Sequence, residues 1–168
     1  IEGSFQKKGW DAVNDLIKAS KEKDTISITL NGAKVFPATV LSEIKGKDIS
    51  LNLDMENGFI WKINGTSITA ETPADTDLSV TNTEEYIPAA LYSLISTNQN
   101  DFGFHLGRNG TFDFPAVLSV KTDASCAGLM ANLFWYDVEN GVLQCIQTIT
   151  VGGAFERSIP YADFTLSK

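Results

Sequence analysis

The alternation of hydrophobic and polar residues is strictest between residues 25 and 30. In the segment Thr25-Ile26-Ser27-Ile28-Thr29-Leu30, hydroxyl and apolar side chains alternate at every step. This period of two predicts a strand that is buried on the side of its isoleucines. The preceding residues 10–23 instead carry apolar side chains at helical spacing, at Trp10, Val13, Leu16 and Ile17. They predict an N-terminal helix.

A ten-residue hydrophobic pattern occurs twice in the chain. Residues 35–44 are echoed by residues 86–95, and each copy carries a proline at its third position, Pro37 or Pro88. Proline is favoured at the first helical position, and the apolar residues that follow it in both copies recur at helical spacing. The repeat predicts two short helices and an internal duplication, with halves at about 24–70 and 77–121.

The Asn-Gly turns predict hairpins, and the pattern around Asn57-Gly58 also predicts a register. Strands at 49–55 and 59–63 could be joined by a two-residue turn, which would pair polar with apolar residues. A three-residue loop gives a uniformly apolar face instead, because it pairs Met55 with Phe59, Leu53 with Trp61, and Leu51 with Ile63. We therefore predict the second register, which buries Trp61.

The same loop chemistry recurs between strands predicted at 129–137 and 142–151. A matching register would pair Val138 with Val142, Tyr136 with Gln144, Phe134 with Ile146, and Asn132 with Thr148. The other face of this hairpin is the more apolar one, so we predict that it faces the core. Its members are Leu129, Ala131, Leu133, Trp135, Leu143, Cys145 and Ile149.

About ten strands are predicted in all, which indicates a mainly β, β-rich α+β fold of the β-sandwich-like kind. The remaining strands are expected at 78–80, 102–106, 112–114, 117–121 and 163–166. At 168 residues the chain fits one domain, 1–168, with C-terminal strands in 122–168. By composition, we predict the junction between the two halves in the polar segment 72–77.

Charge and composition exclude several classes of partner. The net charge is −8, and the lysines at 18–23 are interleaved with acids, so no basic stripe exists for binding nucleic acid. No apolar stretch has the length of a membrane span, and we predict no membrane insertion. The start, Ile1-Glu2-Gly3-Ser4, has neither Met nor a signal-peptide core, so we expect the chain to have been cut from a longer one or to be already processed.

Catalytic signals are weak. His105 is the single histidine and no nucleophile-elbow motif accompanies it, so it is interpreted as an outward-facing strand residue. One histidine with two distant cysteines, Cys126 and Cys145, offers no zinc spacing. Two buried free thiols are favoured over the alternative of a disulfide. No metal or other cofactor is predicted, and the protein is not expected to be an enzyme.

Acidic clusters leave two further alternatives open. The carboxylate pairs Glu84-Glu85, Asp54-Glu56 and Asp137-Glu139 could serve a glycoside hydrolase, although acids in turns are usually explained by capping. The segments 54–57 and 75–77 resemble fragments of calcium loops without matching the full pattern. A structural calcium is therefore an open alternative.

The most suggestive binding surface is the outer face of the second predicted hairpin. It would carry Tyr136, Phe134, Asn132, Gln144 and Thr148. Aromatic rings stack on the C–H faces of sugars while amides and hydroxyls bond the sugar oxygens, so these residues form a candidate carbohydrate platform. The alternative is structural, with the N-terminal helix covering this face.

The chain also resembles a repeat module of cell-surface and dockerin-bearing proteins, of the cellulosome or amylosome type, from gut and rumen Firmicutes. The similar segments lie at 29–37, 40–48, 51–58, 61–65, 127–136 and 161–166. The resemblance covers most of residues 10–168 and has no site motif to transfer.

The resemblance implies an extracellular or cell-surface module that works beside neighbouring modules of one polypeptide. Our leading hypothesis is a non-catalytic module that binds plant polysaccharide or starch. The alternatives are a spacer or protein-interaction module without a ligand and, third, a carboxylate-based glycoside hydrolase.

Overall fold

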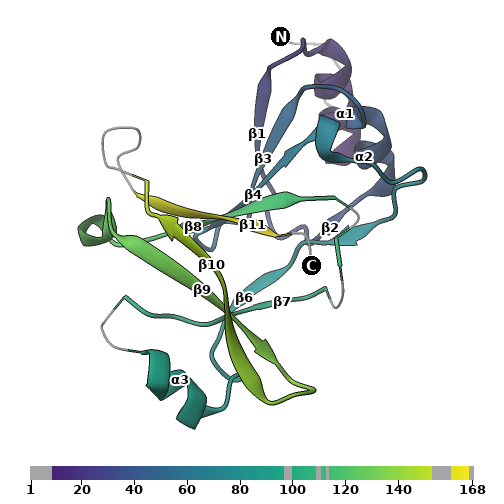
Figure 1. The fold of residues 1–168 in the computed structure, drawn as a ribbon. Helices are drawn as coiled ribbons and strands as arrows, with labels where there is room; N and C mark the ends of the chain where they lie inside the picture. The colour runs from purple at the N-terminus through teal and green to yellow at the C-terminus, as the bar shows by residue number, and fades with distance from the viewer. Residues whose placement is uncertain (1–8, 97–99, 109–110, 113, 153–159, 167–168) are drawn as a thin grey trace.

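The computed structural model describes residues 9–96, 100–108, 111–112, 114–152 and 160–166 (Figure 1). The fold is mainly β, as predicted, with three α-helices and eleven strands in the described residues. The helices are α1 (Trp10–Ala19), α2 (Ala38–Ile44) and α3 (Ala89–Ile95). The strands are β1 (Thr25–Thr29), β2 (Val35–Phe36), β3 (Ser50–Asp54), β4 (Phe59–Asn64), β5 (Thr76–Asp77), β6 (Val80–Asn82), β7 (Phe104–Leu106), β8 (Ala116–Lys121), β9 (Met130–Asp137), β10 (Val142–Thr150) and β11 (Tyr161–Leu166).

Five strands form a central sheet in the order β1-β3-β4-β8-β11. Strands β1 and β3 are parallel, whereas the other neighbours are antiparallel. The remaining strands form three separate pairs, β2 with β5, β6 with β7, and β9 with β10. The side chains of the central strands alternate between a buried face and a partly exposed polar face, as a pleated sheet requires.

The register predicted for the β3–β4 hairpin is confirmed. Leu53 is opposite Trp61, Leu51 is opposite Ile63, and the Met55 N–H donates to the Phe59 carbonyl at 3.0 Å. Trp61 is fully buried, and its indole N–H donates to the carbonyl of Leu78 at 2.8 Å. The uniformly apolar face therefore determines the pairing.

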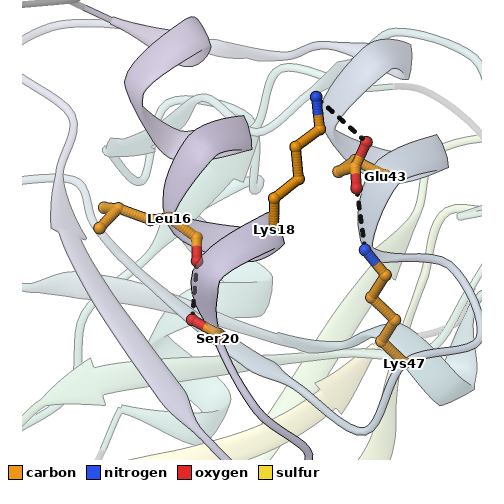
Figure 2. A network of polar contacts seen from close by, with 5 residues as sticks. All are labelled: Leu16, Lys18, Ser20, Glu43 and Lys47. Carbon is orange, nitrogen blue, oxygen red and sulfur yellow. Dashed lines mark hydrogen bonds and ion pairs between the residues drawn. The ribbon is translucent and has the colours of Figure 1, made fainter.

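Helices α1 and α2 lie together on one side of the molecule, away from the β9–β10 hairpin (Figure 1). Val13 and Ile17 of α1 are in the hydrophobic core, and the Trp10 ring lies 5.4 Å from that of Phe36. At the surface, the Glu43 carboxylate of α2 accepts a hydrogen bond from the Lys47 ammonium group at 2.8 Å. Its other oxygen lies 3.9 Å from Nζ of Lys18 in α1 (Figure 2). The alternative in which α1 covers Phe134 and Tyr136 is therefore wrong.

The two copies of the repeat form helices of the same length, but in different surroundings. Pro37 and Pro88 are extended N-cap residues, so each helix begins one residue later than predicted. Helix α2 buries three residues, whereas α3 buries none. The flanking strands also differ, because β1 and β3 are parallel while β6 and β7 are antiparallel. Local sequence thus forms the helix, and its position decides burial.

Other parts of the second half depart from the predicted strand pattern. Phe112 and Phe114 are buried but belong to no strand. Their rings contact each other, and Phe112 also contacts Trp61 at 5.3 Å, so they fill the core as loop residues. The predicted turn at Asn109-Gly110 lies outside the described residues.

Tyr92 links α3 to the loop that precedes it. Burial, followed by a hydrogen bond with Glu84 and the charges of Glu84 and Asp101, raises the pKa of Tyr92 to about 12. Because the folded state favours the neutral phenol, the stability that this raised pKa contributes is complete below pH 10.0, the ordinary tyrosine pKa. It is lost as pH rises towards 12.

We expect the ultraviolet titration of tyrosinate to include one phase near pH 12 that is missing in Tyr92→Phe. Glu84→Gln should move this phase to lower pH, because it removes the nearest negative charge. A late phase of unchanged amplitude in Tyr92→Phe would contradict the assignment.

Candidate functional site

The β9–β10 hairpin is the most apolar exposed part of the described structure. Of the eleven large hydrophobic residues that are exposed, six lie on this hairpin and its flanks. They are Leu129, Met130, Trp135, Val138, Val142 and Ile146, with exposed fractions of 45% to 76%. Asp137 is the single charged residue in the two strands, although the chain carries a net charge of −8. Exposed apolar surface of this kind marks interaction sites.

The turn of this hairpin is built around Asp137. Its carboxylate accepts hydrogen bonds from the side-chain amide of Asn140 at 2.6 Å and from the backbone N–H groups of Asn140 and Glu139. The bonds from Asn140, the side-chain bond first, lower the pKa of Asp137 despite its burial. The Gly141 N–H donates to the Asp137 carbonyl at 2.8 Å, so the loop holds four residues and Asp137 is opposite Val142.

This longer loop makes part of the predicted register wrong. Tyr136 is opposite Leu143 and not Gln144, and Phe134 is opposite Cys145 and not Ile146. A bulge at Ile146 then restores the predicted pairing of Asn132 with Thr148. The Thr148 hydroxyl lies 2.7 Å from Oδ1 of Asn132, which accepts its hydrogen bond.

Four of the five predicted platform residues share one face of the hairpin. Asn132, Phe134 and Tyr136 alternate along β9, and Thr148 is opposite Asn132. Asn132 and Thr148 are exposed, whereas the two aromatic residues are half-buried. The fifth, Gln144, is opposite Trp135 and therefore lies on the other face.

Trp135 is the residue that the sequence interpretation missed. It was expected in the core, but half of its surface is exposed. Leu129 and Cys145, also expected in the core, are exposed too, whereas Leu133 is buried as predicted. Cys126 is buried and both thiols are free, so the prediction of two buried free thiols is wrong only for Cys145.

The exposure of Trp135 follows from how the hairpin is attached. Gln147 in β10 bonds the edge of β11, where its side-chain N–H donates to the Thr165 carbonyl and its oxygen accepts from the Thr165 N–H at 3.0 Å. Further along, the Gly152 N–H donates to the Tyr161 carbonyl. These bonds hold the base of the hairpin, whereas the segment with Trp135 extends beyond the bulge towards the turn.

Three of the candidate acids, Asp54, Asp75 and Asp77, accept bonds in turns or at a helix end. Oδ1 of Asp54 accepts from the Glu56 N–H, and Asp77 accepts from the Ser79 N–H. Asp75 caps α2 by accepting from the Ala38 N–H at 2.7 Å. In the described residues, no three His, Cys, Asp or Glu side chains are grouped so that they could hold a metal ion.

His105 is half-buried in β7, where its ring stacks on that of Tyr86 with the centroids 3.9 Å apart.

Among the described residues, none of the helices has the length and apolar character that a membrane span requires. Comparison of the chain with protein-family models, curated proteins and solved structures finds no match. Function is therefore inferred from the chemistry of the surface itself.

Proposed function

We propose that this chain is a non-catalytic carbohydrate-binding module of a larger extracellular bacterial protein, and that the β9–β10 hairpin binds the glycan. The observation that carries the proposal is the half-exposed ring of Trp135, directly across the hairpin from the amide of exposed Gln144. A flat apolar ring beside an amide offers both contacts that a sugar needs, stacking on its C–H face and bonds to its hydroxyls.

The absence of exposed charge on the two strands favours a neutral glycan. The one charged side chain in β9 and β10 is that of Asp137, which is buried in the turn. The net charge of −8 disfavours the approach of anionic polysaccharides by long-range repulsion. Starch, cellulose, xyloglucan and neutral xylan are the ligands that we expect for this surface.

Trp135→Ala is expected to weaken glycan binding by about tenfold, because it removes the stacking ring. Affinity electrophoresis in gels that contain starch, xylan or xyloglucan measures the effect as a loss of retardation, and sedimentation with cellulose extends the test. Tyr86→Ala is the matched control, since Tyr86 is an exposed aromatic residue outside the hairpin. Tyr136→Ala tests the opposite face of the hairpin.

Equal retardation of the parent and Trp135→Ala would remove Trp135 from the site. If none of the glycans slows the migration of the parent protein, the carbohydrate proposal is wrong. Trp135→Ala and Tyr86→Ala should both keep the fold, because Trp135 is half-exposed and Tyr86 is exposed. Circular dichroism of each variant checks this before binding is measured.

A protein partner is the second candidate ligand of the same hairpin. Five exposed aliphatic side chains accompany Trp135, and such side chains are more usual in protein interfaces than in sugar sites. They are Leu129, Met130, Val138, Val142 and Ile146. Two results together would favour this function. The protein would bind none of the glycans, and it would bind a neighbouring module of the same polypeptide in a way that Val142→Asp abolishes.

A further inference from the structure

A cleft of about 480 Å³ lies on the polar face of the central sheet, away from Trp135. One row of facing residues crosses four strands here, from Asn52 in β3 through Lys62 and Val117 to Thr165 in β11. All four line the cleft, and Pro115 contributes a further apolar surface. The volume is in the range of small-ligand sites.

One end of the cleft is held rigid by hydrogen bonds. The Asn64 amide donates to Asp48 at 3.0 Å and to Ser50 at 3.1 Å, while its oxygen accepts from the Thr66 N–H. The Ser67 hydroxyl donates to the Asn64 carbonyl at 2.7 Å. Polar groups whose positions are fixed before binding lose little entropy when a ligand arrives.

Asn52, at the β3 end of the four-strand row, has different surroundings. Its side chain is half-buried and lines the cleft, but it makes no hydrogen bond with any described part of the protein. A primary amide has two donors and one acceptor oxygen, and those of Asn52 are open to solvent in the cleft. The side chain is therefore available to bond a ligand that both donates and accepts.

The charge in the lining of the cleft is neutralised by an ion pair. Lys62 is the single charged side chain in its lining, and its ammonium group donates to Asp163 at 3.0 Å. The same carboxylate also accepts a bond from buried Ser119. Because the lysine is neutralised and the whole chain is acidic, an anionic ligand gains little here. Hydroxyl-rich neutral ligands fit better.

We propose that this cleft is a second binding site, which takes a neutral polyhydroxylated ligand of the size of a disaccharide through Asn52, Lys62 and Thr165. Its affinity depends on hydrogen bonds, since the lining holds amides, hydroxyls and aliphatic surface but no aromatic ring. The proposal does not rest on the function of the β9–β10 hairpin.

Titration of ¹⁵N-labelled protein with maltose, cellobiose and xylobiose, followed by NMR, tests the cleft and the hairpin separately. We expect at least one disaccharide to shift the side-chain amide signals of Asn52 together with the backbone signal of Thr165. The indole signal of Trp135 reports on the hairpin in the same spectra. A response at Trp135 without one at Asn52 would overturn the cleft proposal and leave the hairpin proposal standing.

Asn52→Ala should weaken binding of the disaccharide in the cleft by about tenfold, because it removes an unbonded amide from the lining. Thr29→Ala is the matched control, since Thr29 lies on the same sheet face two residues beyond Ser27, the β1 partner of Asn52, and does not line the cleft. Thr165→Val is a second test that keeps the backbone bonds to Gln147. Affinity unchanged in both Asn52→Ala and Thr165→Val, or no shift with any of the three disaccharides, would overturn the proposal.

Discussion

Replacing Gly65 with alanine is expected to lower the free energy of unfolding by about 4 kcal/mol. Gly65 is buried directly after β4, where the chain passes the end of α2. An added Cβ would overlap the Ile44 carbonyl oxygen and lie 2.5 Å from that of Lys47. Both obstacles are backbone atoms, which cannot rotate away as a flexible side chain can.

Hydrogen bonds on both sides of Gly65 prevent it from moving aside. Its N–H donates to the Ile49 carbonyl at 3.0 Å, and its carbonyl accepts from the Gly46 N–H at 2.9 Å. Relief of the overlap would therefore break a bond between Gly65 and the segment that follows α2. Urea unfolding followed by circular dichroism measures the loss.

Two other glycines provide matched controls for this substitution. Gly46→Ala meets no atom within 4 Å but requires φ of +78°, so a cost of about 1–2 kcal/mol is expected. Gly152→Ala has an ordinary contact of 3.5 Å with the Tyr161 carbonyl oxygen and should cost less than about 0.5 kcal/mol. If Gly65→Ala were as stable as Gly152→Ala, the close approach described for Gly65 would be wrong.

Trp61→Ala is the second large effect, with an expected loss of about 3–5 kcal/mol. Trp61 is fully buried in the centre of the sheet and contacts the ring of Phe112 at 5.3 Å. The smaller side chain would leave a cavity bounded by β4 and the loop residues that pack against it. Denaturant unfolding should show an earlier midpoint for Trp61→Ala.

Trp61→Phe separates the hydrogen bond from the packing. Phenylalanine keeps most of the apolar volume but leaves the Leu78 carbonyl without its indole donor, which should cost about 1–3 kcal/mol. The control is Trp135→Ala, which should change stability by less than about 0.5 kcal/mol because half of that ring already lies in solvent. Equal losses for Trp61→Ala and Trp135→Ala would contradict the burial assigned to these two residues.

The two hairpins show what local sequence can predict. Around β3 and β4, every residue of one face is apolar, so a single register buries them all, and the prediction is confirmed. The β9–β10 hairpin has a very similar loop, with Asp137 in the place of Asp54 and Asn140 in the place of Asn57. Yet the first loop pairs Met55 with Phe59, whereas the second pairs Asp137 with Val142.

A long-range contact accounts for this difference. The Asn57 side chain donates to the carbonyl of Val80 at 2.9 Å, whereas the Asn140 side chain turns back to Asp137. No pattern within the loop reveals that Val80 is available to one hairpin and not to the other. The register error placed Gln144 beside Tyr136. Trp135 was assigned to the core for another reason, because its face of the hairpin is the more apolar one in the sequence.

In the repeated segment, local pattern also could not predict which of the two helices buries its apolar residues. The prolines and helical spacing correctly predicted helices α2 and α3. Their equivalent apolar positions become buried in α2 but only half-buried in α3, because α2 packs with α1 over the core. The sequence did predict that Asn132, Phe134, Tyr136 and Thr148 share one face, since alternation along a strand does not depend on the cross-strand partner and Thr148 keeps its predicted pairing.

The side chain of Gln147 has a consequence for the solubility of the whole molecule. A border strand ordinarily displays backbone groups that invite another chain to extend the sheet. At Thr165 both of those groups are already satisfied by one glutamine, which imitates a peptide unit. The protein can thus carry an exposed apolar hairpin at its periphery while this stretch of border is closed to fibre-like growth.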